Sequence, residues 1–85
     1  MPRPFFPHTL ADVTRAVDGG LGLVVGDMPD GSIWVLKRER KRPGHYLLRH
    51  YADAQRSRLI EERPIEGRAP AVNAMAAAIG LDERL

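Results

Sequence analysis

Two turn sequences divide the middle of this chain into short segments, DMPDG at 27–31 and RKRPG at 40–44. In each turn a proline presets φ and a glycine accepts the positive φ that closes a tight hairpin. The segments around them are too short for helices and rich in valine, leucine and ring-bearing residues, which is typical of strands. Tight turns between consecutive strands predict an antiparallel meander. The predicted strands are Leu21–Gly26, Ser32–Glu39 and His45–Tyr51.

The next segment, Arg56–Arg63, is harder to assign. Arg58, Ile60 and Glu62 would alternate with Leu59, Glu61 and Arg63 between the two faces, which suits an edge strand that protects itself with charge. Glutamate and arginine are also good helix formers, so a helix is the alternative. We favour a strand because a meander is already in progress. Pro64 is expected to end it, and Pro64–Ala69 is predicted to be a linker.

A helix is predicted at the start of the domain, from Thr9 or Leu10 to Asp18. The Thr9 hydroxyl can accept a hydrogen bond from the backbone N–H of Asp12, whose negative charge also suits a helix start. The pair Gly19–Gly20 is expected to end this helix, because glycine accepts the left-handed conformation. One apolar stripe at helical spacing follows the cap: Leu10, Val13 and Val17.

A second helix is predicted near the end of the chain, over 71–79. Pro70 stands at a position favoured in the first turn of a helix, and Gly80 is the expected C-terminal cap. Its small residues would let it meet a second copy of the chain across a two-fold axis, so a homodimer is the alternative to packing on the sheet. Its apolar stripe is Val72, Met75 and Ile79.

These elements predict an α+β fold in one small domain. An N-terminal helix, a three- to four-stranded antiparallel meander and a C-terminal helix must cover one another, and the simplest arrangement lays both helices on one face of the sheet. The other face would then be left for solvent or binding. Residues 1–8 form a proline-rich arm, residues 9–81 the domain and residues 82–85 a short tail.

Positive charge is concentrated in residues 37–58. This segment carries eight cations against two anions, whereas residues 1–36 and residues 59–85 each carry a net charge of −2. The sequence KRERKR at 37–42 places five cations in six residues at the expected tip of the second hairpin. Such crowding is unfavourable unless an anion or salt relieves it, so it indicates a polyanionic partner.

Nucleic acid is the polyanion that this pattern favours. The guanidinium group of arginine makes two-point contacts with phosphates and with the edge of guanine. A two-stranded β-ribbon fits the major groove of DNA. We therefore predict a small, non-enzymatic DNA-binding module. Trp34, Tyr46, His50 and Tyr51 would be available to stack on unpaired bases. The predicted nucleic-acid-binding residues are Lys37, Arg38, Arg40, Lys41, Arg42, Arg49, Arg56 and Arg58.

Two other interpretations of the basic segment stay open. It can be a solvated hairpin whose charges prevent edge pairing, with Glu61, Glu62 or Glu66 as internal partners. It can also dock an acidic protein, which predicts a protein-interaction module such as an inhibitor, an adaptor or an accessory protein of a phage or mobile element. Phe5 and Phe6 are then the candidate partner-binding residues, although one of them can instead pin the arm to the core.

The sequence offers no recognisable catalytic or metal chemistry. The absence of cysteine excludes disulfides and thiolate metal sites. His45 and His50 are five residues apart, which puts them on opposite faces of a strand. The glycines at 19–22 precede a strand, whereas a phosphate-binding loop needs them before a helix. We expect no enzyme activity, no metal and no cofactor.

A membrane location is not expected either. No stretch approaches the roughly 18–20 apolar residues that span a bilayer. The first seven residues contain three prolines and lack the apolar core of a signal peptide. The sequence therefore predicts a cytoplasmic protein.

One resemblance covers residues 31–79. Gly31-Ser32-Ile33, a basic hairpin, another strand and then a helix follow one another in this segment. This order resembles the arm-binding domains of phage integrases, which implies a three-stranded sheet covered by a helix. The leading helix and the first strand fall outside that pattern.

Overall fold

The computed structural model describes residues 9–19 and 23–85. The predicted arm, with Phe5 and Phe6, lies outside the described residues. The described elements follow the predicted order of helix, strands and helix. They are α1 (Leu10–Asp18), β1 (Leu23–Asp27), β2 (Ile33–Arg38), β3 (His45–Tyr51), β4 (Leu59–Glu66) and α2 (Arg68–Ala78).

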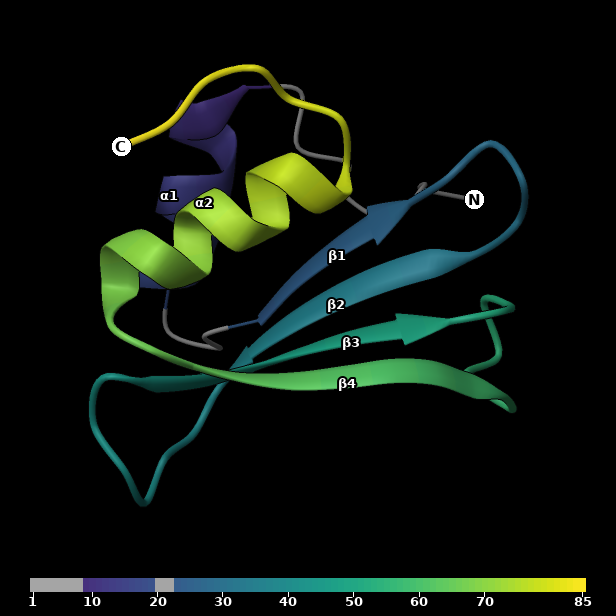
Figure 1. Cartoon of the computed structure of the whole chain (residues 1–85), viewed down its shortest axis with the longest axis horizontal. Helices are drawn as coiled ribbons and strands as arrows, with labels where there is room; N and C mark the ends of the chain where they lie inside the picture. The colour runs from purple at the N-terminus through teal and green to yellow at the C-terminus, as the bar shows by residue number, and fades with distance from the viewer. Residues whose placement is uncertain (1–8, 20–22) are drawn as a thin grey trace.

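The four strands form one antiparallel sheet in the order β1-β2-β3-β4. Both helices lie on the same side of this sheet, and α2 is drawn in front of α1 in the view of Figure 1. The predicted α+β class, the meander and the placement of the helices are confirmed. The segment around residue 60 is a strand, so the helical alternative for Arg56–Arg63 is wrong.

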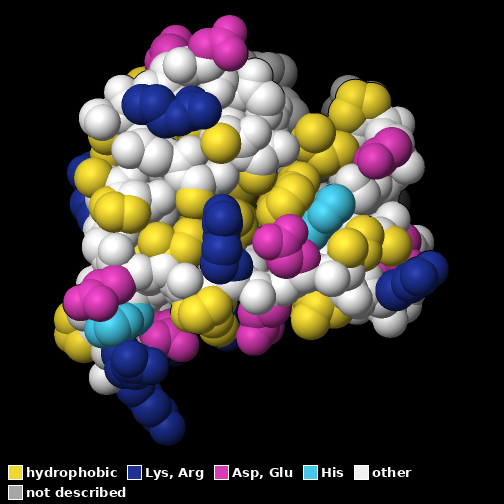
Figure 2. All heavy atoms as spheres, in the orientation of Figure 1, with side chains coloured by type: hydrophobic (Ala, Val, Ile, Leu, Met, Phe, Trp, Pro, Cys, Tyr) yellow, Lys and Arg dark blue, Asp and Glu magenta, His cyan; other side chains and the backbone are white. Residues whose placement is uncertain are grey.

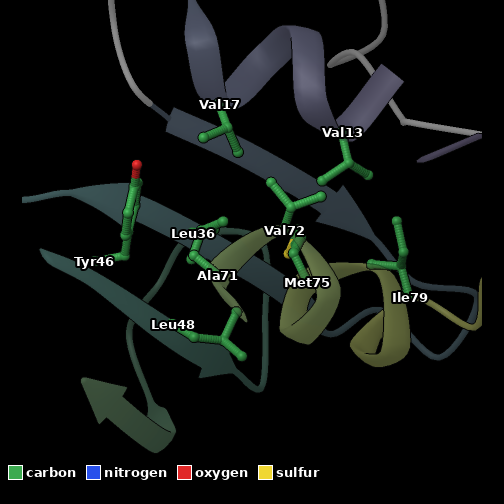
Figure 3. Packing of buried hydrophobic residues seen from close by; sticks show 9 residues of the cluster. All are labelled: Val13, Val17, Leu36, Tyr46, Leu48, Ala71, Val72, Met75 and Ile79. Atoms are coloured by element: carbon green, nitrogen blue, oxygen red, sulfur yellow. The ribbon is translucent and has the colours of Figure 1, made fainter. Parts of the chain in front are cut away.

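The core fills the space between the helices and one face of the sheet. Leu36 of β2 and Leu48 of β3 are opposite each other in register and are almost completely buried. Figure 3 shows them pointing toward α2, with Val13 and Val17 of α1 above. The stripes predicted from helical spacing are therefore the buried faces of both helices. The cluster consists of Val13, Val17, Leu36, Tyr46, Leu48, Ala71, Val72, Met75 and Ile79.

Helix α1 begins as its sequence predicts. The Thr9 hydroxyl accepts a hydrogen bond from the Asp12 N–H at 3.2 Å, and the Asp12 carboxylate accepts one from the Thr9 N–H at 3.3 Å. This reciprocal capping box satisfies two backbone donors that a helix start leaves free. The helix ends at Asp18, but Gly19 is extended, with φ −67° and ψ 163°. The prediction of a left-handed glycine is thus wrong for Gly19, and Gly20 lies outside the described residues.

The prediction of a linker at Pro64–Ala69 is wrong at both ends. Strand β4 runs through Pro64 to Glu66, and α2 already begins at Arg68. Proline is tolerated inside β4 because this is an edge strand, where the missing N–H can face away from the sheet. Gly67, at φ +100°, makes the whole turn from strand to helix. At the other end of α2, Gly80 has φ +86°, as the predicted cap requires.

An exposed ion pair joins the two helices. Arg68, at the start of α2, donates to both carboxylate oxygens of Asp18, at the end of α1, over 2.8 and 2.6 Å. This two-point contact holds the pKa of the Asp18 carboxyl below its ordinary value and raises that of the Arg68 guanidinium. It thereby connects two residues fifty positions apart in the chain.

We expect Asp18→Asn to reduce the acid sensitivity of folding. Because the pKa of Asp18 is lower in the folded state, its contribution is present above the unfolded pKa of about 3.9 and is lost as the pH falls through the folded value. Thermal melts between about pH 2 and pH 6 should show the wild type more stable at the upper end, with the difference shrinking toward the lower end. A difference that stays constant over this range would contradict the expectation.

Candidate nucleic-acid interface

The basic hairpin is a defined loop that projects from the body of the protein. Its backbone is closed by two hydrogen bonds, from the Glu39 N–H to the His45 carbonyl at 2.9 Å and from the His45 N–H to the Arg42 carbonyl at 3.0 Å. Gly44, at φ +80°, completes the turn as predicted. Figure 1 shows the loop between β2 and β3 at the lower left, extending past the sheet and away from the helices.

The cations of this loop form few close ion pairs. In the part of the chain that the structure describes, Lys37, Arg38, Arg40 and Lys41 form no ion pair within 4.0 Å. Arg42 reaches the Glu39 carboxylate at 4.0 Å, with 65 % of its side chain exposed. Figure 2 shows dark-blue side chains projecting where the hairpin lies in Figure 1. Because water screens such a long, exposed pair, it contributes little to neutralisation.

The hairpin cations border a shallow depression of about 540 Å³. Lys37 and Leu47, paired neighbours on β2 and β3, line it together with residues 38–42. The sequence did not single out Leu47, because its position under the basic loop follows from the strand register. Leu47 can make apolar contacts with an anionic ligand, while the surrounding cations attract its negative charge.

The structure separates the other three predicted cations from this group. Arg49 lies in the middle of β3 and donates to the Glu62 carboxylate of β4 at 2.7 Å. That bond, with a smaller contribution from Tyr51, raises the pKa of the Arg49 guanidinium. Arg56 and Arg58 lie in the loop that follows β3, at the far end of that strand from the basic hairpin. The described chain therefore brings together five of the eight predicted residues.

Most of the residues predicted to stack on bases lie on the side of the sheet that the helices cover. Trp34 stacks on His50 with ring centroids 4.0 Å apart and planes 3° from parallel. Tyr46 is 6 % exposed and belongs to the core. Tyr51 faces the side of the sheet away from the helices and is half-buried. From the sequence, the alternation of side chains along a strand assigns Tyr46 and His50 to one face and Tyr51 to the other. Which of the two faces is covered depends on where the helices pack.

The acidic residues of β4 do not neutralise the hairpin. Glu62 pairs with Arg49, while Glu61 and Glu66 form no ion pair with a described cation within 4.0 Å. Farther along, the Asp53 carboxylate accepts hydrogen bonds from the backbone N–H and the hydroxyl of Ser57, which lowers its pKa. Asp53 thus shapes its own loop.

Neither a metal-binding group nor a membrane-spanning helix is found in the described part of the chain. Residues 9–19 and 23–85 contain no group of three histidine or acidic side chains that could hold a metal ion. Within the same ranges, neither helix has the length and apolar composition needed to cross a bilayer.

Comparison with known proteins finds no matching family, no matching curated protein and no matching solved structure. The resemblance of residues 31–79 to integrase arm-binding domains accordingly remains an expectation.

Proposed function

We propose that this protein binds nucleic acid through the β2–β3 hairpin, by contacts with backbone phosphates. The observation that carries the proposal is the set of cations at 37, 38, 40 and 41, which form no described ion pair on a loop that projects from the body. A phosphate backbone would relieve their mutual repulsion and release condensed counterions, and that release provides most of the affinity of such contacts.

Duplex DNA fits this surface better than a single strand does. Proteins that hold single strands combine cations with exposed rings on which bases stack. Here Trp34, His50 and Tyr46 lie on the helix side of the sheet, so the basic loop lacks such a platform. A two-stranded ribbon with a basic tip can still enter the major groove, where phosphates position it.

An acidic protein partner is the second candidate. The feature in its favour is Leu47, which adds an apolar contact to the cation-lined depression. Protein interfaces combine an apolar centre with a polar rim, whereas phosphate contacts need charge alone. The two candidates can be separated by experiment, because the first requires binding to added DNA and the second requires binding to a protein.

The test is fluorescence anisotropy of the full chain with labelled random duplex DNA and with single-stranded RNA. If all five hairpin cations contact phosphates, duplex affinity should fall roughly 500-fold between about 50 and 200 mM salt, a logarithmic slope of about −4.5. Arg40→Glu/Arg42→Glu should weaken binding and reduce the slope to about −2.7 or less, because two phosphate contacts are lost.

The matched control is Arg15→Glu/Arg84→Glu, which makes the same change in net charge away from the hairpin. Circular dichroism should show both variants folded. The proposal is wrong if the hairpin variant binds like the wild type, or if the control loses as much affinity as the hairpin variant. Absence of duplex binding even at low salt would favour the acidic partner, to be sought by pull-down from a nuclease-treated lysate.

A further inference from the structure

The basic hairpin bends toward the face of the sheet opposite the helices. In Figure 1 the loop between β2 and β3 turns away from the helices. Leu36 and Leu48 point toward the helices, and side chains alternate along a strand, so Lys37 and Leu47 lie on the opposite face. Both line the depression of about 540 Å³ together with loop residues 38–42. The depression therefore lies between the bent loop and that face, and the hairpin cations border one hollow.

The lining of this depression carries an excess of positive charge. It contains five cations and one carboxylate, that of Glu39, which gives a net formal charge of +4. The pKa of the Asp18 carboxyl is lowered mainly by Arg68 and to a smaller extent by Arg38, so part of the Arg38 charge acts outside the depression. Between three and four positive charges therefore remain for a ligand in the depression.

Such a concentration of charge fits a compact polyphosphate better than it fits one phosphate of a nucleic acid. A backbone phosphate carries a single negative charge, and its neighbours lie farther along the strand. A triphosphate carries about four negative charges, because its terminal group contributes about two and each inner group one. Lysine and arginine both bind phosphate oxygens, arginine through two-point contacts. One bound triphosphate would thus neutralise most of the lining.

The depression also has room and contacts for an organic group. A volume of about 540 Å³ falls within the roughly 300–1,000 Å³ of small-molecule sites. Leu47 is half-buried in the lining and offers an apolar contact to a sugar or a base. The Glu39 carboxylate, 4.0 Å from Arg42, can accept a hydrogen bond from a sugar hydroxyl. Inorganic polyphosphate would leave both of these groups unused.

We propose that this depression binds a nucleoside polyphosphate, and that this ligand competes with DNA for the hairpin cations. Only the competition rests on the proposed function, because polyphosphate binding needs the depression alone. The same guanidinium and ammonium groups cannot contact a bound polyphosphate and backbone phosphates at once. Each ligand therefore weakens binding of the other, by the same factor. DNA binding by this protein would then respond to the concentration of free nucleotide.

The first test is isothermal titration calorimetry of the full chain with ATP, inorganic tripolyphosphate and adenosine at about 50 mM salt. We expect ATP to bind with a dissociation constant below about 1 mM, and adenosine not to bind. Arg40→Glu/Arg42→Glu should weaken ATP binding at least about tenfold, since two attractive charges become repulsive. Leu47→Thr should weaken ATP binding about threefold, which corresponds to roughly 25 Å² of lost apolar contact, and should leave tripolyphosphate binding unchanged.

Each variant has a matched control. Leu59→Thr makes the same substitution at an exposed side chain of β4 that does not line the depression. Arg15→Glu/Arg84→Glu makes the same charge change as the hairpin variant, away from the hairpin. Both controls should bind ATP like the wild type. Circular dichroism identifies a variant that has lost its fold, and threonine is chosen because its branched side chain favours strands.

The second test repeats the DNA anisotropy titration with ATP and, in parallel, with sodium chloride of the same ionic strength. ATP should displace DNA at a lower ionic strength than chloride does. The proposal is overturned if ATP does not bind, if either the hairpin variant or Leu47→Thr binds ATP like the wild type, or if ATP displaces DNA no better than chloride. Hairpin-dependent ATP binding without any DNA binding would refute the proposed function and support the nucleotide site.

Discussion

Replacing Leu36 by alanine is expected to lower the free energy of unfolding by about 2–5 kcal/mol. Leu36 is 1 % exposed and lies near the middle of β2, where it meets Leu48 and both helices (Figure 3). The loss combines the transfer free energy of the removed methyl groups with the cavity that they leave. In a domain of this size that is a large share of the total stability.

Urea titration and thermal melting at one fixed protein concentration measure this loss. The melting temperature should fall by roughly 4–8 °C for each kcal/mol lost. Leu85→Ala is the control, because it removes the same atoms from a side chain that is 53 % exposed and should change stability by less than about 0.5 kcal/mol. Equal stability of Leu36→Ala and Leu85→Ala would contradict the described core.

Gly26→Ala is expected to destabilise the fold by about 1–3 kcal/mol, because a methyl group there overpacks the core. Gly26 is buried on β1, opposite Trp34, beneath the end of α2. A Cβ at this position would lie 2.5 Å from Cγ2 of Ile79 and 3.3 Å from Cε of Met75. The first distance is too short for two carbon atoms that are not bonded. Either the Ile79 side chain or the whole of α2 therefore has to shift.

A double-mutant cycle tests the cause. Ile79→Leu removes the branch at Cβ while keeping the volume of the side chain, so the added methyl group gains room. In that background Gly26→Ala should cost at least about 0.5 kcal/mol less than in the wild type. Additive effects of the two substitutions would mean that the close approach of α2 to β1 is not the source of the loss.

The sequence predicted some of the residues of the candidate nucleic-acid interface correctly, but not which of them lie together. Turn chemistry placed residues 37–42 at one hairpin tip, because proline and glycine act on their immediate neighbours. Turn chemistry could not predict how far Arg56 and Arg58 lie from that tip, because this distance depends on the full length of β3. Seven strand residues lie between the tip and that loop, so nearness in sequence did not bring these cations to one surface.

The sequence by itself determined what local chemistry controls. The Thr9–Asp12 capping box, the glycine turns at 31 and 44 and the apolar stripes of both helices act over a few residues, and the structure contains each of them. Only the tertiary structure decided which sheet face the helices cover, and with it the burial of Tyr46 and the stacking of Trp34 on His50. Pro64 stays inside β4 for a similar reason: a strand tolerates proline only where no neighbour needs its N–H, and neighbours are set by the whole sheet.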